Sequence, residues 1–156
     1  MRKFLSIVLV SALFFGASSC YKVHHNYIVK TEWYLNALEL DGGSTNFMNG
    51  ILPDYVDGDG YYKIYMLDNG ISRGEYYVYD TLNYFVTGTW DLLSPDSIYI
   101  ELDEYVEGTF FIELVDLNEM ILSTNHNNVK FFGIGDVKAV VRCSKGEATS
   151  QASTTP

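Results

Sequence analysis

The chain has 156 residues, a formal net charge of −10 and a hydrophobic fraction of 47%. This length supports one domain with its own core. The excess of carboxylates disfavours nucleic-acid binding, because it repels phosphate backbones. A content of 13 tyrosines and 9 phenylalanines against 3 prolines favours β-sheet, in which aromatic side chains pair across neighbouring strands.

The N-terminus has the pattern of an export signal. A basic start, Met1-Arg2-Lys3, precedes the apolar run Phe4–Phe15, and small residues end directly before Cys20. The run is too short to cross a bilayer, which takes about 20 helical residues. The pattern resembles the lipobox of bacterial lipoproteins, in which the cysteine becomes the acylated first residue of the mature protein. We therefore expect residues 1–19 to be a cleaved signal helix and Cys20 to carry a lipid. The alternative is an ordinary secretory signal that leaves Cys20 a plain thiol.

Cleavage before Cys20 would leave 137 residues with 8 basic and 20 acidic side chains, a net charge of −12. Several acyl chains hold a protein on a membrane without a spanning helix. No acidic residue occurs in Tyr21–Val23, so we expect an outer-membrane anchor facing the periplasm, with cell-surface display as the alternative. An acylated Cys20 leaves Cys143 without a disulfide partner, which is typical of a small core residue.

Residues 20–30 show no long periodic pattern and are predicted to be a tether. The first strand is predicted over Thr31–Leu40 and the ordered barrel over residues 31–144. The loop Asp41–Gly60 is rich in Gly, Asn and Asp, and loops of this length are uncommon unless they have a function. We expect this loop to act as a movable lid.

Seven further runs alternate with turn signals at the spacing of an antiparallel sandwich or barrel. They are Tyr61–Leu67, Ser72–Tyr79, Tyr84–Asp91, Ser97–Asp103, Thr109–Val115, Glu119–Thr124 and Val137–Ser144. With the first strand they make eight. Alternation predicts that Ile98, Ile100 and Leu102 share one face of their strand, as do Val137, Ala139, Val141 and Cys143 of theirs. The Ser/Thr-rich residues 145–156 are predicted to be a disordered tail.

One hairpin can be predicted to the residue. A two-residue turn in Asp68-Asn69-Gly70 would place Lys63 opposite Tyr76, which mixes apolar and charged side chains on one face. A three-residue loop with Gly70 in the left-handed conformation places Lys63 opposite Glu75 and keeps one face apolar. We therefore favour the second register, with Tyr62 opposite Tyr76.

Four tyrosines of this hairpin then point outward: Tyr61, Tyr65, Tyr77 and Tyr79. Tyrosine is common in protein interfaces, so these residues are candidates for a partner surface. The equally weighted alternative is cross-strand packing, with Arg73 stacked on a ring.

Three motifs resemble those of the lipocalin-like domains of bacterial envelope lipoproteins. They are Trp33 in the first strand, Gly88-Thr89-Trp90 in the middle, and the strand–turn–strand Phe110–Leu122. The resemblance implies an all-β fold, an antiparallel up-and-down eight-stranded barrel of the calycin type with an internal cavity. A barrel of eight strands is either filled by its side chains or holds one small ligand.

The inward-facing residues expected to line this calyx are Trp33, Tyr62, Ile64, Tyr76, Val78, Trp90 and Phe110. Met66, Ile98, Ile100 and Ile112 complete the inward set. The expected function is therefore that of a membrane-anchored lipoprotein binding a small hydrophobic or amphiphilic ligand. The alternative is a non-enzymatic interaction subunit of an envelope protein complex, docking through the tyrosine hairpin.

The remaining motifs give little support for a metal site or a catalytic site. The acids Asp54, Asp57 and Asp59 invite a calcium interpretation but miss the register of the Asp-x-Asp-x-Asp-Gly loop, so a solvated acidic loop is favoured over an irregular calcium site. His24-His25 has no further ligand beside it, so the two histidines are expected to be exposed residues of the tether. Glu101 with Asp103 fits a solvated strand face. No nucleophile elbow, zinc helix or phosphate loop occurs. We expect no enzyme activity, no cofactor and no metal.

Overall fold

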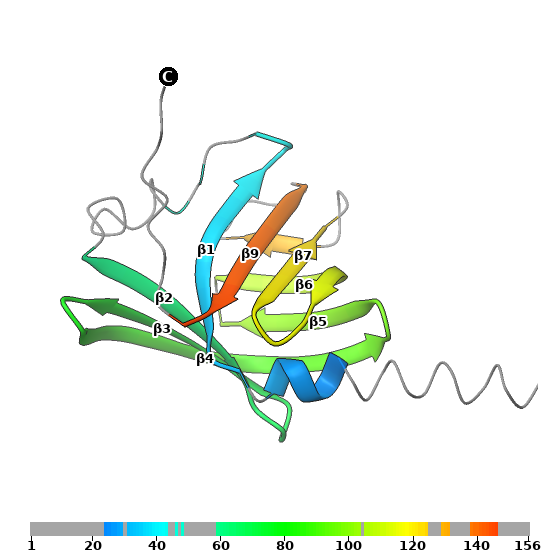
Figure 1. The fold of residues 1–156 in the computed structure, drawn as a ribbon, viewed down its shortest axis with the longest axis horizontal. Coiled ribbons are helices and arrows are strands. Elements are labelled where there is room, and N and C mark those ends of the chain that lie inside the picture. The colour runs from blue at the N-terminus through cyan, green and yellow to red at the C-terminus, as the bar shows by residue number, and fades with distance from the viewer. Residues whose placement is uncertain are drawn as a thin grey trace, which may run out of the picture.

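A computed structural model describes residues 24–29, 31–43, 46, 48, 59–103, 105–124, 129–131 and 138–146. The predicted signal helix, Cys20, most of the predicted lid and the tail beyond residue 146 lie outside these ranges. The strands are β1 (Trp33–Leu40), β2 (Gly60–Met66), β3 (Ile71–Val78), β4 (Thr81–Ser94), β5 (Ser97–Leu102), β6 (Val106–Val115), β7 (Glu119–Ser123), β8 (Val129–Phe131) and β9 (Ala139–Lys145). Figure 1 shows these strands curving around a common interior.

The strands close into a barrel. Each of β1 to β6 pairs with the next strand along the chain, and β9 lies between β7 and β1. Because β5 pairs with both β4 and β6, the ring is complete with eight antiparallel strands. The predicted up-and-down eight-stranded barrel is therefore confirmed. The ninth strand, β8, was not predicted; it adds to β6 at Val106–Gly108.

The β2–β3 hairpin has the predicted three-residue loop. Lys63 pairs with Glu75 and Tyr62 with Tyr76, and Gly70 has a φ of 77°. The Leu67 amide donates to the Ile71 carbonyl at 2.8 Å, which closes the loop. A residue with a side chain would be strained at this φ, so glycine sets the turn and thereby the register.

β4 turns the corner of the barrel. Its first part, Thr81–Thr89, pairs with β3, and its last part, Trp90–Ser94, pairs with β5. At the change of partner, a Cβ on Gly88 would lie 2.1 Å from the Glu101 carbonyl oxygen. Only glycine allows this close approach. Before this point, the β3–β4 hairpin extends beyond the ring as a ribbon (Figure 1).

Side chains that alternate along the strands form the core. Ile98, Ile100 and Leu102 are buried on β5, as are Ala139, Val141 and Cys143 on β9, and both alternations were predicted. A bulge in β6 between Ile112 and Leu114 changes which residues point inward. Phe110 before the bulge and Val115 after it are buried, whereas Ile112, predicted to point inward, is only partly buried.

The N-terminal segment differs from the predicted tether. Residues 24–29 form a helix in which Ile28 has no exposed surface. The Trp33 indole donates to the Ile28 carbonyl at 3.2 Å, and a His24 ring nitrogen lies 2.6 Å from the Pro95 carbonyl oxygen. His25 packs against Trp90, with ring centroids 5.6 Å apart.

The predicted exposure of His24 and His25 is corrected by these contacts. Both residues are partly buried, and the helix that carries them lies at the end of the barrel at which β4 ends and β5 begins (Figure 1). Six helical residues are too few to show a periodic pattern, so the sequence carried no signal of the helix. Among the described residues, no helix is long and apolar enough to cross a membrane.

Candidate ligand site in the barrel

The barrel encloses a small apolar cavity of about 50 Å³. Its wall includes Leu38 on β1, Tyr62 on β2, Leu102 on β5, Phe110 on β6 and Leu122 on β7. One water occupies roughly 10–15 Å³ by the same kind of measure, whereas sites for drug-sized molecules have about 300–1,000 Å³. The interior is therefore mostly filled by its own side chains, with room left for a short apolar group.

Bulky residues account for this filling. Phe110, Met66 and Met120 line the cavity and are each at most 1% exposed. Burying each such side chain contributes roughly 1.5–3 kcal/mol to stability. The packing that stabilises the barrel thus also limits the space in it.

One residue of the predicted lid reaches the cavity. The Asn46 side chain accepts hydrogen bonds from the amides of Leu38 (3.0 Å) and Met48 (3.1 Å) and donates to the Asn36 carbonyl (2.9 Å). The bonds to Leu38 and Asn36 attach the segment to β1, and the bond from Met48 fixes Met48 relative to Asn46. They deliver Met48, which is 1% exposed, into the cavity wall.

Four tyrosines gather at the end of the barrel opposite the helix, and we call them the mouth tyrosines: Tyr62, Tyr76, Tyr84 and Tyr105. They lie where β2 and β4 begin and where β3 and β5 end, which is one end in an antiparallel ring. The Tyr84 ring lies 5.3 Å from that of Tyr76 and 6.2 Å from that of Tyr105, between centroids. Two of the four, Tyr62 and Tyr105, also line the cavity.

Two of the mouth tyrosines, Tyr62 and Tyr84, hold their protons at physiological pH because their surroundings raise the pKa of each. Burial, and then the neighbouring Tyr84 and Tyr105, raise the pKa of Tyr62 above its ordinary value. Burial, and then Tyr105 and Tyr76, raise the pKa of Tyr84 to about 12. A neutral phenol both donates and accepts hydrogen bonds. The cavity and its mouth together suit a molecule with an apolar end and a polar end.

The predicted calyx residues lie at three depths. Tyr62, Ile64 and Phe110 line the cavity. Tyr76 is at the mouth, and Val78 is partly buried at the end of β3. The two tryptophans, Trp33 and Trp90, lie at the helix end, where the Trp90 indole donates to the Leu67 carbonyl at 2.8 Å and Trp33 bonds to the helix.

Sequence reasoning missed several residues of this site, and Tyr84, Tyr105 and Met48 show why. Tyr84 could have been found, because it alternates with the buried Val86 on β4. Tyr105 lies in a turn and Met48 in a long loop. No strand period applies there, so the sequence gave no sign that either residue faces the interior.

Outside the barrel, three rings surround the Lys63 ammonium group. Its distances to the ring centroids are 5.0 Å for Tyr34, 5.7 Å for Tyr61 and 5.2 Å for Tyr77. Tyr61 and Tyr77 stack on each other at 5.0 Å. Burial opposes the charge, but the Tyr34 hydroxyl, Tyr65 and other neighbours outweigh it and raise the pKa of Lys63. We call Lys63, Tyr34, Tyr61 and Tyr77 the lysine cage.

The rest of this face is also paired within the domain. Glu75, 7% exposed, accepts a 2.6 Å hydrogen bond from the Tyr77 hydroxyl and forms a 2.6 Å ion pair with Arg73. Arg73 in turn stacks on Phe85, 4.6 Å from its centroid. Of the four predicted surface tyrosines, Tyr61, Tyr65 and Tyr77 are partly buried and Tyr79 is 72% exposed.

A wider hollow on the outer face is open to solvent. It lies over β6, β7 and β9, between Phe111, Lys138 and Arg142. Arg142 is held there by a 3.0 Å ion pair with Glu39. Because this hollow encloses nothing, the interior cavity is the better candidate site.

The acidic motifs bring no metal site together in the described parts of the chain. Asp54 and Asp57 lie outside the described residues, and Glu101 accepts a 2.9 Å hydrogen bond from the Thr89 hydroxyl. No group of three or more potential metal ligands occurs among the residues that the structure describes.

No protein-family model matches this chain, and neither does any curated protein.

Proposed function

We propose that this protein is a membrane-anchored, non-enzymatic lipoprotein that binds a small hydrophobic or amphiphilic molecule in its barrel. The observation that carries the proposal is an apolar cavity with the four mouth tyrosines at its end, two of which, Tyr62 and Tyr105, line it. The apolar end of the ligand would enter the cavity, and its polar end would bond to the tyrosine hydroxyls. The pattern before Cys20 supports the anchor, in the outer membrane and facing the periplasm, or at the cell surface.

The cavity volume restricts the ligand. About 50 Å³ accepts a short apolar group, such as the end of an acyl chain. A longer stretch of chain requires Met48 to move aside. Methionine is unbranched and fits irregular spaces in many rotamers, which makes it a suitable residue to yield to a ligand.

Two cavity variants with opposite effects test the proposal. Met48→Ala enlarges the cavity, and Val106→Phe fills it beside Tyr105. With cis-parinaric acid as a fluorescent fatty-acid probe, Met48→Ala should bind more tightly than wild type and Val106→Phe should lose binding. The matched control is Val140→Phe, which adds the same volume on the outer face.

Thermal melts separate loss of binding from loss of folding, because a bound probe stabilises the folded state by mass action. Equal probe affinity in Met48→Ala, Val106→Phe and the control would contradict binding in the barrel. If the variants differ in probe affinity as expected, native mass spectrometry of protein purified from its membrane would identify the natural ligand.

A second candidate function is docking to another envelope protein. Three exposed apolar side chains favour it, all on the β3–β4 hairpin: Tyr79 (72%), Phe85 (54%) and Leu82 (40%). Loss of a co-purifying partner in Tyr79→Ser/Phe85→Ser, but not in Leu114→Ser on β6, would support this function. Identical co-purification by both would remove it.

A further inference from the structure

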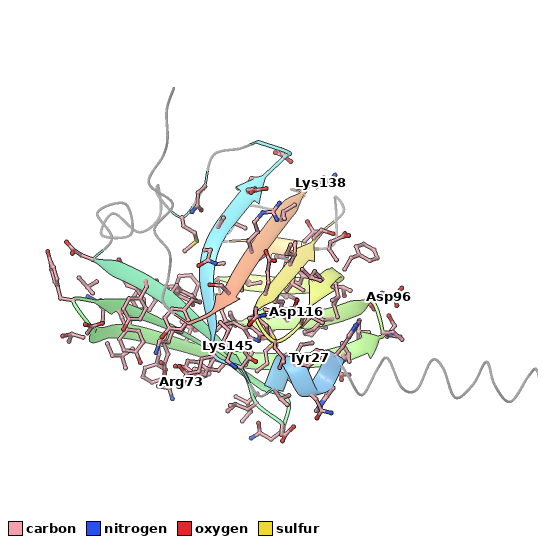
Figure 2. All side chains as sticks on the ribbon, viewed as in Figure 1. Tyr27, Arg73, Asp96, Asp116, Lys138 and Lys145 are labelled. Carbon is pink, nitrogen blue, oxygen red and sulfur yellow. The ribbon has the colours of Figure 1, made fainter. Side chains whose placement is uncertain are left out.

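The turns at the helix end of the barrel carry exposed leucines. Leu67 (42%) precedes the β2–β3 turn, Leu93 (53%) lies at the end of β4, and Leu117 (56%) is in the β6–β7 turn. In an antiparallel ring these three turns share one end. Figure 2 shows Asp96 and Asp116, from two of these turns, on the same side of the barrel as Tyr27 of the helix, with Lys138 far from them.

The helix fixes how far Cys20 can lie from these turns. His24 is held at the β4–β5 turn by its 2.6 Å contact with Pro95. Four Cα steps separate Cys20 from His24, and an extended chain spans roughly 3.3–3.6 Å per residue. The Cys20 Cα therefore lies within about 14 Å of the His24 Cα.

We infer that the helix end of the barrel rests on the lipid bilayer, with Leu67, Leu93 and Leu117 in the headgroup region and the mouth tyrosines facing away. This inference depends on the proposed acylation of Cys20. The three residues between Cys20 and His24 are too few to let the opposite end of the barrel reach the membrane, because that end is a full strand length from His24. The exposed Tyr79 and Phe85 are at that opposite end, so exposed apolar side chains alone do not show which end contacts the membrane. The short spacer after Cys20 does.

The carboxylates at the helix end of the barrel restrict the headgroup charge of the membrane that it can contact. Asp68, Asp96 and Asp116 lie in the same three turns. Asp116 accepts hydrogen bonds from the amides of Asn118 (2.7 Å) and Glu119 (2.9 Å), which hold its pKa below the ordinary value and keep it ionised. Carboxylates repel anionic headgroups, so the surface suits zwitterionic lipids.

The test uses the acylated protein in phosphatidylcholine vesicles that contain a lipid spin-labelled near the headgroup. A fluorophore is attached at Leu117→Cys or, as the control, at Lys138→Cys on the opposite end. Cys143 is buried and does not compete for the label. We expect strong quenching at position 117 and little at position 138. A flexible Gly/Ser insertion between Val23 and His24 should bring the two values together.

Two failures can be told apart. A chain that carries no acyl mass and does not float with vesicles refutes the anchor, and the orientation with it. A chain that is acylated and floats, but whose two labels are quenched equally, refutes the orientation alone.

Discussion

Removing the Ile28 side chain tests whether the N-terminal helix is part of the folded domain. Ile28 has no exposed surface, and its carbonyl oxygen accepts the hydrogen bond from the buried Trp33 indole. If the helix is docked, Ile28→Ala leaves a cavity between the helix and the barrel. If residues 24–29 were a free tether, the same substitution would change almost nothing.

The expected cost follows from burial. Truncation of a fully buried isoleucine to alanine costs about 2–5 kcal/mol, and a short terminal helix can partly relax into the space, which places the value near the lower limit. With a urea m-value of about 1–3 kcal/mol/M, a loss of about 2–3 kcal/mol lowers the unfolding midpoint by roughly 0.7–3 M.

Urea unfolding followed by tryptophan fluorescence measures both effects. The midpoint should fall, and the native emission should shift to the red as water approaches Trp33. Asn26→Ala, on the exposed side of the same helix, is the control and should stay within about 0.5 kcal/mol of wild type. A midpoint for Ile28→Ala equal to that of the control, with unchanged emission, would refute the docked helix.

Three further predictions concern the barrel. Burial raises the pKa of Cys143 from 9.0 to about 12, so the folded thiol holds its proton more tightly than the unfolded one; its contribution to the free energy of unfolding should be intact below pH 9.0 and lost toward pH 12, a slope that Cys143→Ala should lack in pH-dependent urea unfolding. Gly88→Ala should lower the melting temperature more than Gly74→Ala, because both new Cβ atoms meet an oxygen at 2.1 Å but only at Gly74 does it belong to a side chain that can move; equal melting temperatures would contradict this. Lys63→Met should cost about 1–2 kcal/mol in urea unfolding, through loss of its contacts with three rings; an unchanged midpoint would show that the lysine cage contributes nothing.

The antiparallel strands could be predicted because alternation and turn signals are local, but these patterns left a sandwich and a barrel both open, and closure into a ring was implied only by the resemblance to lipocalin-like domains. Alternation gave the buried face of β5 and β9, and the need to keep Lys63 opposite Glu75 gave the register at Gly70. Three features were missed because each is too short to show a periodic pattern. The helix has six residues, β8 has three, and the β6 bulge changes the period by one residue, so each is shorter than a pattern that a sequence can display.

The candidate site was only half predictable, because a strand period reports which face a residue occupies and not its depth along the barrel axis. Trp33 and Phe110 both face inward and are both fully buried. Yet Phe110 lines the cavity, while Trp33 bonds to the helix. Depth depends on how neighbouring strands are staggered, which is a property of the closed ring.

Depth also explains why the two ends of the barrel can have different functions. At the helix end, both indole N–H groups are engaged with main-chain carbonyls, those of Ile28 and Leu67, and this end is packed and fixed. At the mouth, Met48, Tyr62 and Tyr105 border the remaining space, and a methionine side chain can move without leaving a charge buried. In the proposed arrangement, a barrel held to a bilayer at its rigid end would keep its adaptable end accessible, so that anchoring and ligand binding would not compete for the same surface.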